Sequence, residues 1–192
     1  RMRHDDAYTP DGRHGMRPDY PSIVYSKTLK QLFPDVPVVL GGIEASLRRL
    51  THYDYWEDKL KKCILCESGA DIILYGMGEK NTLQLCRELE NGRSIKDVKD
   101  IPQTVYLAKK EDIPGGITDT DIVLHSHEEC LRNKKAQAEN FRHIEEESNK
   151  MHAQRLIQGV DHQFAVVNPP YPPMTTEELD AAFDLPYTRL PH

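Results

Sequence analysis

Residues 36–50 read Val-Pro-Val-Val-Leu-Gly-Gly-Ile-Glu-Ala-Ser-Leu-Arg-Arg-Leu, and this stretch decides the fold. A short run of β-branched and apolar residues reaches Gly41 and Gly42 and continues at once into a helix-like segment. This order is typical of a strand that ends at the ligand-binding edge of an open α/β sheet. Because glycine has no Cβ, the backbone can adopt a positive φ here, and a ligand or another segment can approach closely.

The same order of elements occurs a second time before residue 92. Ala70–Tyr75 predicts a buried strand, Gly76-Met77-Gly78-Glu79 predicts a turn, and the residues up to Gly92 predict a helix with Leu85, Cys86 and Leu89 on its apolar face. Two strand–turn–helix units in succession form a βαβα arrangement, which implies parallel strands and a right-handed crossover. The predicted fold class is therefore α/β, with a parallel, Rossmann-like sheet.

Helices are expected on both sides of the first strand. Asp19 is a plausible N-cap, and Pro21 suits the first turn of a helix that runs to about Phe33. Asp54 and Glu57 have the spacing of a capping box, which predicts a second helix that stops near Gly69. This second helix would carry Trp56, Leu60, Cys63 and Ile64 on one face.

The second half of the chain has a weaker pattern. Short strands are expected over residues 104–107, 121–124 and 164–167. A long charged helix is expected from the capping box at Ser126 to about Gln158, with Gly159 as its stop. The end of the chain is punctuated by prolines. We expect residues 1–110 to form an α/β domain that is incomplete at its start, and residues 111–192 to form a helical and proline-rich connector.

Composition narrows the class of protein. The 192 residues carry a net charge of −6, which argues against nucleic-acid binding, and no apolar run approaches the roughly 18 residues of a membrane helix. Four scattered cysteines are too few for a secreted disulfide scaffold, so we expect reduced thiols and a cytoplasmic protein.

The two glycine turns are the best candidates for a cofactor-binding site, because parallel strands present their carboxyl ends at one edge. The candidate residues are Gly41, Gly42, Ser46, Gly76, Gly78 and Glu79. The alternative is that the glycines serve only turn geometry. Neither turn matches GxGxxG, and the chain has no GxxxxGK[ST] loop, so dinucleotide and triphosphate binding are disfavoured.

Other clusters have simpler interpretations. Cys63 and Cys66 have CxxC spacing, but no second pair completes a metal set, so Cys63 is expected in the core and Cys66 beside it. His125 and His127 stand at a loop-to-helix junction, where capping and solvation explain them. The aromatic residues of 52–56, His-Tyr-Asp-Tyr-Trp, either pack at a helix start or stack on a planar ligand or a neighbouring domain. No catalytic residues and no metal ligands can be assigned from spacing.

Several blocks together resemble the YgiQ-type radical SAM proteins. They are Asp5–Pro10, Val38–Arg49, His52–Trp56, Tyr75–Glu79, Val167–Pro170 and Leu185–Arg189 with Pro191-His192, and they span essentially the whole chain. The two glycine turns are also similar to those of the cobalamin-binding type of Rossmann-like domain. The resemblance implies a parent protein that binds a [4Fe-4S] cluster and cleaves S-adenosylmethionine, with a radical SAM barrel as the partner of this region.

The chain departs from that pattern in two places. The cluster motif of the superfamily, CxxxCxxC, is absent, so the cluster ligands are expected outside this chain, beyond Pro191-His192. A DxHxxG cobalamin loop is absent too, because Asp161-His162 has neither the spacing nor the position, and cobalamin is not assigned. The leading interpretation is an accessory N-terminal part of a radical SAM enzyme. The alternative is a stand-alone flavodoxin-like binding or interaction module without redox chemistry.

Overall fold

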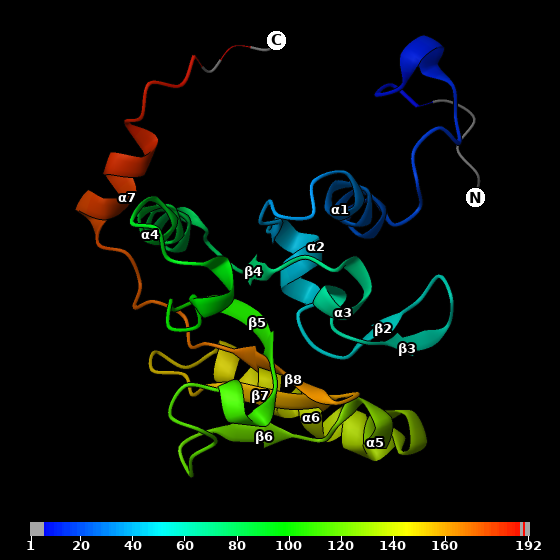
Figure 1. Ribbon diagram of the computed structural model, residues 1–192, viewed down its shortest axis with the longest axis vertical. Coiled ribbons are helices and arrows are strands. Elements are labelled where there is room, and N and C mark those ends of the chain that lie inside the picture. The colour runs from blue at the N-terminus through cyan, green and yellow to red at the C-terminus, as the bar shows by residue number, and fades with distance from the viewer. Residues whose placement is uncertain (1–5, 189, 191–192) are drawn as a thin grey trace.

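The computed structural model describes residues 6–188 and residue 190, and its centre is a six-stranded sheet (Figure 1). The residues named above at 1–5, 189 and 191–192 lie outside this description. Across the sheet the strands are β1 (Val39–Leu40), β4 (Ile72–Leu74), β5 (Thr104–Ala108), β8 (Gln163–Val167), β7 (Leu156–Val160) and β6 (Ile122–Leu124). A separate hairpin contains β2 (His52–Asp54) and β3 (Lys59–Lys61).

The α/β fold class is confirmed, and so is the parallel pairing of the first two strands. Val39 pairs with Ile72 and Leu40 with Ile73 in the parallel register that the two repeated units predict. Beyond β4 the sheet is mixed, because β5, β8 and β7 follow one another antiparallel and β6 then pairs parallel with β7. One continuous sheet thus joins strands from both sides of residue 110.

The helices of the described chain are α1 (Pro21–Leu32), α2 (Gly42–Leu47), α3 (Ile64–Ser68), α4 (Glu79–Glu90), α5 (His127–Arg132), α6 (Lys134–Ser148) and α7 (Thr176–Phe183). Helices α3 and α4 cover opposite faces of the sheet, whereas α7 has no buried residue and lies beside α4 (Figure 1). Because successive strand residues point to opposite faces, Ile73 belongs to the core cluster that includes α3, whereas Ile72 and Leu74 pack with Leu85 of α4. Among the described residues, none of the helices is both long and apolar enough to cross a membrane.

The prediction of a helix from Asp54 to Gly69 is wrong for most of that range. Residues 52–61 form the β2–β3 hairpin, and only Ile64–Ser68 are helical. Asp58 has a left-handed φ of 52°, which suits the turn of a hairpin and interrupts a helix. The carboxylate of Asp54 accepts the N–H groups of Trp56 and Glu57, so its capping pattern stabilises a turn that is not the start of a helix.

The prediction of one long helix from Ser126 to Gln158 is also wrong toward its C-terminal end. Its capping box is confirmed, because Ser126 and Glu129 exchange both hydrogen bonds. The helix is broken at Asn133, where φ is −138° and ψ is 104°, and α6 ends at Ser148. Residues 156–160 join the sheet as β7, paired on both sides, and this tertiary pairing overrides the local helical pattern. Strands β5, β6 and β8 lie where the sequence predicts them.

Candidate functional site

The two glycine turns meet at one edge of the sheet. Gly41 and Gly42 follow β1 and lead into α2, while Gly76 and Gly78 follow β4 and lead into α4. Gly42 and Gly76 have φ values of +77° and +68°, a region that favours glycine. Since β1 and β4 are parallel neighbours, their carboxyl ends bring both turns to the same side.

Ser46 connects the two turns directly. Its hydroxyl donates to the carbonyl of Gly42 at 2.8 Å and accepts the N–H of Gly76 at 3.2 Å. Four of the six candidate residues, Gly41, Gly42, Ser46 and Gly76, therefore form one connected structure. Gly78 is the N-cap residue of α4, and the exposed Glu79 occupies the first turn of that helix. A carboxylate at this position is favourable for the helix itself.

Gln103, which the sequence interpretation missed, holds the second turn in place. Its side-chain amide donates to the carbonyl of Tyr75 at 2.7 Å and to the carbonyl of Met77. A Cβ on Gly76 would lie 3.1 Å from Gln103 Nε2, so a side chain here would have to displace the Gln103 amide as well as adopt an unfavourable φ. The signal for Gln103 is absent from local sequence, since its partners lie more than 25 residues away.

A groove of about 190 Å³ lies beside the second turn. One wall is formed by Tyr75, Gly76, Met77 and Lys80, and the other by residues 170–174, with Gln103 between them. The proline-rich segment is fixed there because the Asn168 amide donates to the carbonyls of Lys99 and Ile101 and to the Thr104 hydroxyl. Of the six candidate residues, only Gly76 lines this groove.

Arg49 and Tyr75 fill the space behind the turns. The Arg49 guanidinium lies 5.1 Å from the centre of the Tyr75 ring, and the Tyr75 hydroxyl donates to the Asn168 carbonyl at 2.6 Å. Burial raises the pKa of Tyr75 to about 12, and burial also lowers the pKa of Arg49. Both shifts are those expected for groups removed from water, so this pair serves packing and does not supply a proton at neutral pH.

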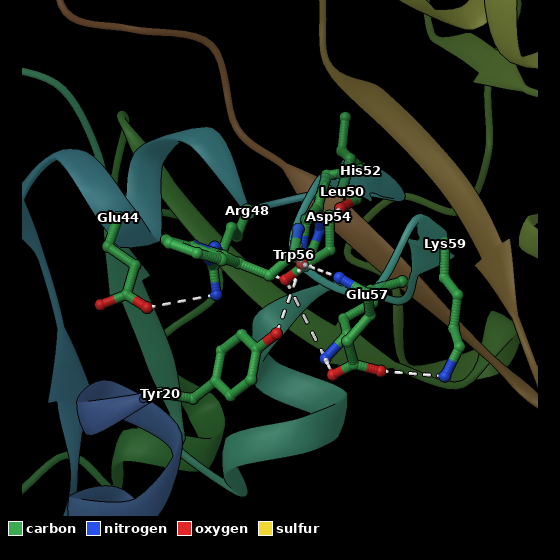
Figure 2. Close-up of polar contacts among 10 residues, drawn as sticks. Tyr20, Glu44, Arg48, Leu50, His52, Asp54, Trp56, Glu57 and Lys59 are labelled. Atoms are coloured by element: carbon green, nitrogen blue, oxygen red, sulfur yellow. Dashed lines mark hydrogen bonds and ion pairs between the residues drawn. The ribbon is translucent and has the colours of Figure 1, made fainter. Parts of the chain in front are cut away.

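A second polar cluster surrounds Asp54, as Figure 2 shows. The Asp54 carboxylate is almost fully buried and accepts three hydrogen bonds on one oxygen, from the N–H groups of Trp56 and Glu57 and from the Tyr20 hydroxyl. Its other oxygen lies 3.9 Å from an Arg48 nitrogen and 4.0 Å from the Lys61 ammonium. The cluster thereby ties the hairpin to α2 and to the residue that precedes α1.

Electrostatics keep the carboxylates of this cluster ionised. Burial alone would raise the pKa of Asp54, but the hydrogen bonds from Glu57, Trp56 and Tyr20 and the charge of Lys61 outweigh it and lower that pKa. Lys61 and Lys59 lower the pKa of Glu57 to about 2. The Lys61 ammonium also lies 4.2 Å from the centre of the Tyr20 ring. One Asp54 oxygen is fully hydrogen-bonded, whereas Oδ2 is buried without a hydrogen-bond partner among the described residues and faces the charges of Arg48 and Lys61. The contacts of this cluster join the hairpin to α2 and Tyr20, which indicates a structural role.

Trp56 stands at the rim of this cluster and is 69% exposed. The interpretation that it packs at a helix start is therefore wrong. Its ring lies against that of Tyr55, with 4.8 Å between centroids. It borders a cleft of about 1190 Å³ whose other wall is the N-terminal arm, including Arg17 and Asp6, which form an ion pair at 2.6 Å.

The cysteines do not form a ligand set. Cys63 and Cys130 are buried, Cys66 is half-buried, and Cys86 is exposed. Within residues 6–188 and residue 190, no group of three or more His, Cys, Asp and Glu side chains is placed to hold a metal ion. A [4Fe-4S] cluster is held by cysteine thiolates, so the described residues do not fit that group. Cys63 lies in the core as expected, although it precedes α3 and is not inside a helix.

The two histidines near α5 have structural partners. His127 is buried, with its Nδ1 3.1 Å from the Thr51 hydroxyl, and His125 pairs with Glu139 at 2.8 Å. The first contact fastens α5 to the loop that follows α2, and the second fastens the segment that precedes α5 to α6.

Comparison with known proteins decides the family. The model of the family described as "Radical SAM N-terminal" matches residues 1–192, the whole chain. The chain belongs to the Radical SAM N-terminal family. The chain is 59% identical to a UPF0313 protein of Bacteroides thetaiotaomicron, 56% identical to one of Porphyromonas gingivalis and 42% identical to one of Geobacter sulfurreducens.

Each of these three matches covers all of this Radical SAM N-terminal chain but only 30–32% of the relative. The chain thus spans less than a third of the length of these relatives. No solved structure gave a significant match. The resemblance to radical SAM proteins drawn from the sequence blocks is confirmed by the family match.

Proposed function

We propose that this chain is the accessory N-terminal α/β part of a radical SAM enzyme and that its paired glycine turns face the catalytic barrel of the same polypeptide. The family match supports the first half of this proposal. The hydrogen bond between Ser46 and Gly76 supports the second half, because it joins the two turns into one edge. The length of the relatives leaves room for a barrel in the same polypeptide.

Several apolar side chains on this edge are exposed, and contact with another protein surface would remove them from water. Ile43 and Leu47 lie one helical turn apart on α2 and are 80% and 70% exposed, and Met77 beside Gly76 is exposed as well. Adjacent exposed apolar residues mark interaction sites in soluble proteins. The Ser46 hydroxyl, the Gly42 carbonyl and the Gly76 N–H already bond one another, so we expect the edge to contribute shape and apolar contact to docking.

The parent protein would bind a [4Fe-4S] cluster and S-adenosylmethionine. Three cluster thiolates would come from a CxxxCxxC segment elsewhere in the polypeptide, since the cysteines of this chain are scattered. The cluster would supply the electron that cleaves S-adenosylmethionine, and this chain's residues would contribute only the docking edge. Cobalamin is not part of the proposal. The four free cysteines are consistent with a cytoplasmic protein, which we also propose.

The first experiment asks where the cluster ligands lie. The full-length polypeptide is reconstituted anaerobically with iron and sulfide, as wild type and as a variant with Cys63→Ala, Cys66→Ser, Cys86→Ser and Cys130→Ala. We expect equal iron content and equal absorbance of the brown cluster in the two proteins. A cluster lost from the variant, in protein that remains folded by circular dichroism, would show that ligands lie inside this chain.

The second experiment tests the docking edge. Ile43→Glu with Leu47→Glu in the full-length polypeptide should slow reductive cleavage of S-adenosylmethionine at least tenfold at unchanged cluster content. Leu131→Glu, at an exposed apolar position on α5, is the matched control and should have no effect. Equal cleavage rates in the two variants would contradict docking through this edge.

A stand-alone binding module is the second candidate, and the groove between Tyr75 and Pro173 is the observation that favours it. Its volume of about 190 Å³ suits a small ligand or a single side chain. The sequence of the full-length gene separates the candidates. A CxxxCxxC motif downstream of His192 supports the radical SAM proposal, and a full-length gene without one favours the binding module.

A further inference from the structure

Helix α1 exposes its apolar stripe. Tyr25, Leu29 and Leu32, with Phe33 directly after the helix, recur at helical spacing, and each is 45–65% exposed. The face of α1 that packs on the protein is instead centred on Ser26, the single buried residue of the helix, with Ile23 partly buried against the core and Lys30 paired with Asp71. An amphipathic helix normally buries its apolar stripe, so this one lacks its cover among the described residues.

Strand β1 is an edge strand of the sheet. Within the described chain it pairs only with β4. Val38 directs both backbone groups toward β4, because its carbonyl accepts the N–H of Asp71 and its own N–H donates to the Asp71 carboxylate. Backbone groups alternate in direction along a strand, so the N–H and C=O of Val39 point to the open edge. The Val39 side chain is 39% exposed.

Topology identifies what belongs at this edge. A helix that leads into a parallel strand is normally the crossover of a right-handed βαβ unit, in which the preceding strand lies next to the following one. Strand β1 is parallel to β4, and α1 leads into β1. Residues 6–20, which precede α1 in the described chain, contain a single 3-10 turn at Pro10–Gly12 and no strand.

We propose that one further strand of the same polypeptide, from a segment that precedes these residues, pairs parallel with β1 and packs its apolar side chains beneath Tyr25, Leu29 and Leu32. Pairing would satisfy the backbone groups of Val39, and packing would cover the α1 stripe. Polypeptides as long as the relatives can supply such a segment. The inference concerns the fold alone and stands or falls independently of radical SAM chemistry.

Photocrosslinking in the full-length polypeptide identifies the occupant. A benzoylphenylalanine replaces Leu32, which is 65% exposed, in one variant and Phe141, which is 60% exposed on α6, in a control variant. After irradiation, mass spectrometry of the peptides should show Leu32→benzoylphenylalanine joined to a segment that precedes Arg1. The control should not label that segment.

The other crosslinking outcomes overturn the proposal. A crosslink from position 32 to residues after His192 would assign the stripe to the following domain. A crosslinked species of twice the mass would assign it to a second copy of the chain. Absence of any crosslink from position 32 would leave the stripe in water, which equally contradicts the proposal.

Hydrogen exchange of the same full-length protein tests the strand pairing. The Val39 amide should exchange at least 100-fold more slowly than expected for an unpaired amide, because it would donate to the new strand. Leu29→Glu with Leu32→Glu should abolish this protection while leaving the amides of β5 and β8 protected, since those strands lie in the sheet interior. Fast exchange at Val39 in the wild-type protein would overturn the proposal.

Discussion

Ser46 accepts the N–H of Gly76 at 3.2 Å and thereby joins the turn after β1 to the turn after β4. The same hydroxyl donates to the Gly42 carbonyl, so one side chain fixes both turns. Thirty residues separate Ser46 from Gly76 in the sequence. The edge that we propose for docking is therefore preorganised by a contact that no local pattern predicts.

Ser46→Ala removes both hydrogen bonds at this edge. We expect a loss of about 1 kcal/mol in the free energy of unfolding, the usual net contribution of such bonds. The Gly76 amide should also exchange faster with solvent, because its acceptor is gone. Urea denaturation and hydrogen exchange measure the two effects.

Ser148→Ala is the matched control for this variant. Ser148 also donates to a carbonyl one helical turn earlier, that of Ile144, but it connects no second element. Its loss should leave exchange at Gly76 unchanged. If Ser46→Ala does not change exchange at Gly76 either, the bridge between the turns does not form in solution.

Gly76→Ala should be more destabilising than Gly42→Ala. Both positions have φ near +70°, so each substitution costs about 1 kcal/mol of backbone strain. Only at Gly76 does the new Cβ meet another group, at 3.1 Å from Gln103 Nε2, whereas nothing lies within 4 Å at Gly42. Chemical denaturation of the two variants measures the difference, and equal losses would contradict the close approach of Gln103.

Asp54→Asn should destabilise the protein by about 1–3 kcal/mol, because it removes the charge that faces Arg48 and Lys61 inside a buried cluster. Asp58→Asn is the control, since Asp58 accepts one exposed hydrogen bond from Tyr53 and Asn tolerates its left-handed φ. The control should lose less than 0.5 kcal/mol in the free energy of unfolding. The fluorescence anisotropy of Trp56 should be lower in Asp54→Asn than in Asp58→Asn, which would locate the effect in the hairpin. If the two variants have the same free energy of unfolding and the same anisotropy, Asp54 has no structural role.

The parts of the fold that the sequence predicts correctly are those set by local pattern. The paired glycine turns, the strands predicted over residues 70–75 and 104–107 and the capping box at Ser126 each depend on a few adjacent residues. The error at residues 54–69 has a physical cause too. Asp54 followed by Glu57 suits a hairpin turn as well as a helix cap. The left-handed Asp58, which decides for the hairpin, is not visible in hydrophobic spacing.

The candidate site was predictable only in outline. Gly41, Gly42 and Gly76 are recognisable because glycine after an apolar run has a geometric meaning. Gln103 and Tyr171 act through contacts across the fold, with Tyr171 bonding Gln84 through its hydroxyl and Gln103 through its N–H. Such partners are decided by the topology of the sheet, and a single sequence does not contain that information.

Stability should fall as the pH drops from 7.5 to 5.5, because His52 and His127 have lowered pKa values in the folded protein. Burial is the main cause for both, and at His52 the charge of Arg48 also lowers the pKa. Below the ordinary pKa of 6.5 the unfolded chain binds these protons more readily than the folded chain, so stability is complete above 6.5 and declines below it. Protonation of Asp and Glu contributes little to this decline, since their ordinary pKa values, 3.8 and 4.5, lie below pH 5.5.

The thermal unfolding midpoint, measured at several pH values between 7.5 and 5.5, tests this expectation. The variant with His52→Gln and His127→Gln should show a smaller decrease in midpoint than the wild type, because it has lost both titrating groups. His152→Gln, at an exposed position, should follow the wild type. If the double variant declines as steeply as the wild type, protonation of these two histidines does not cause the acid sensitivity.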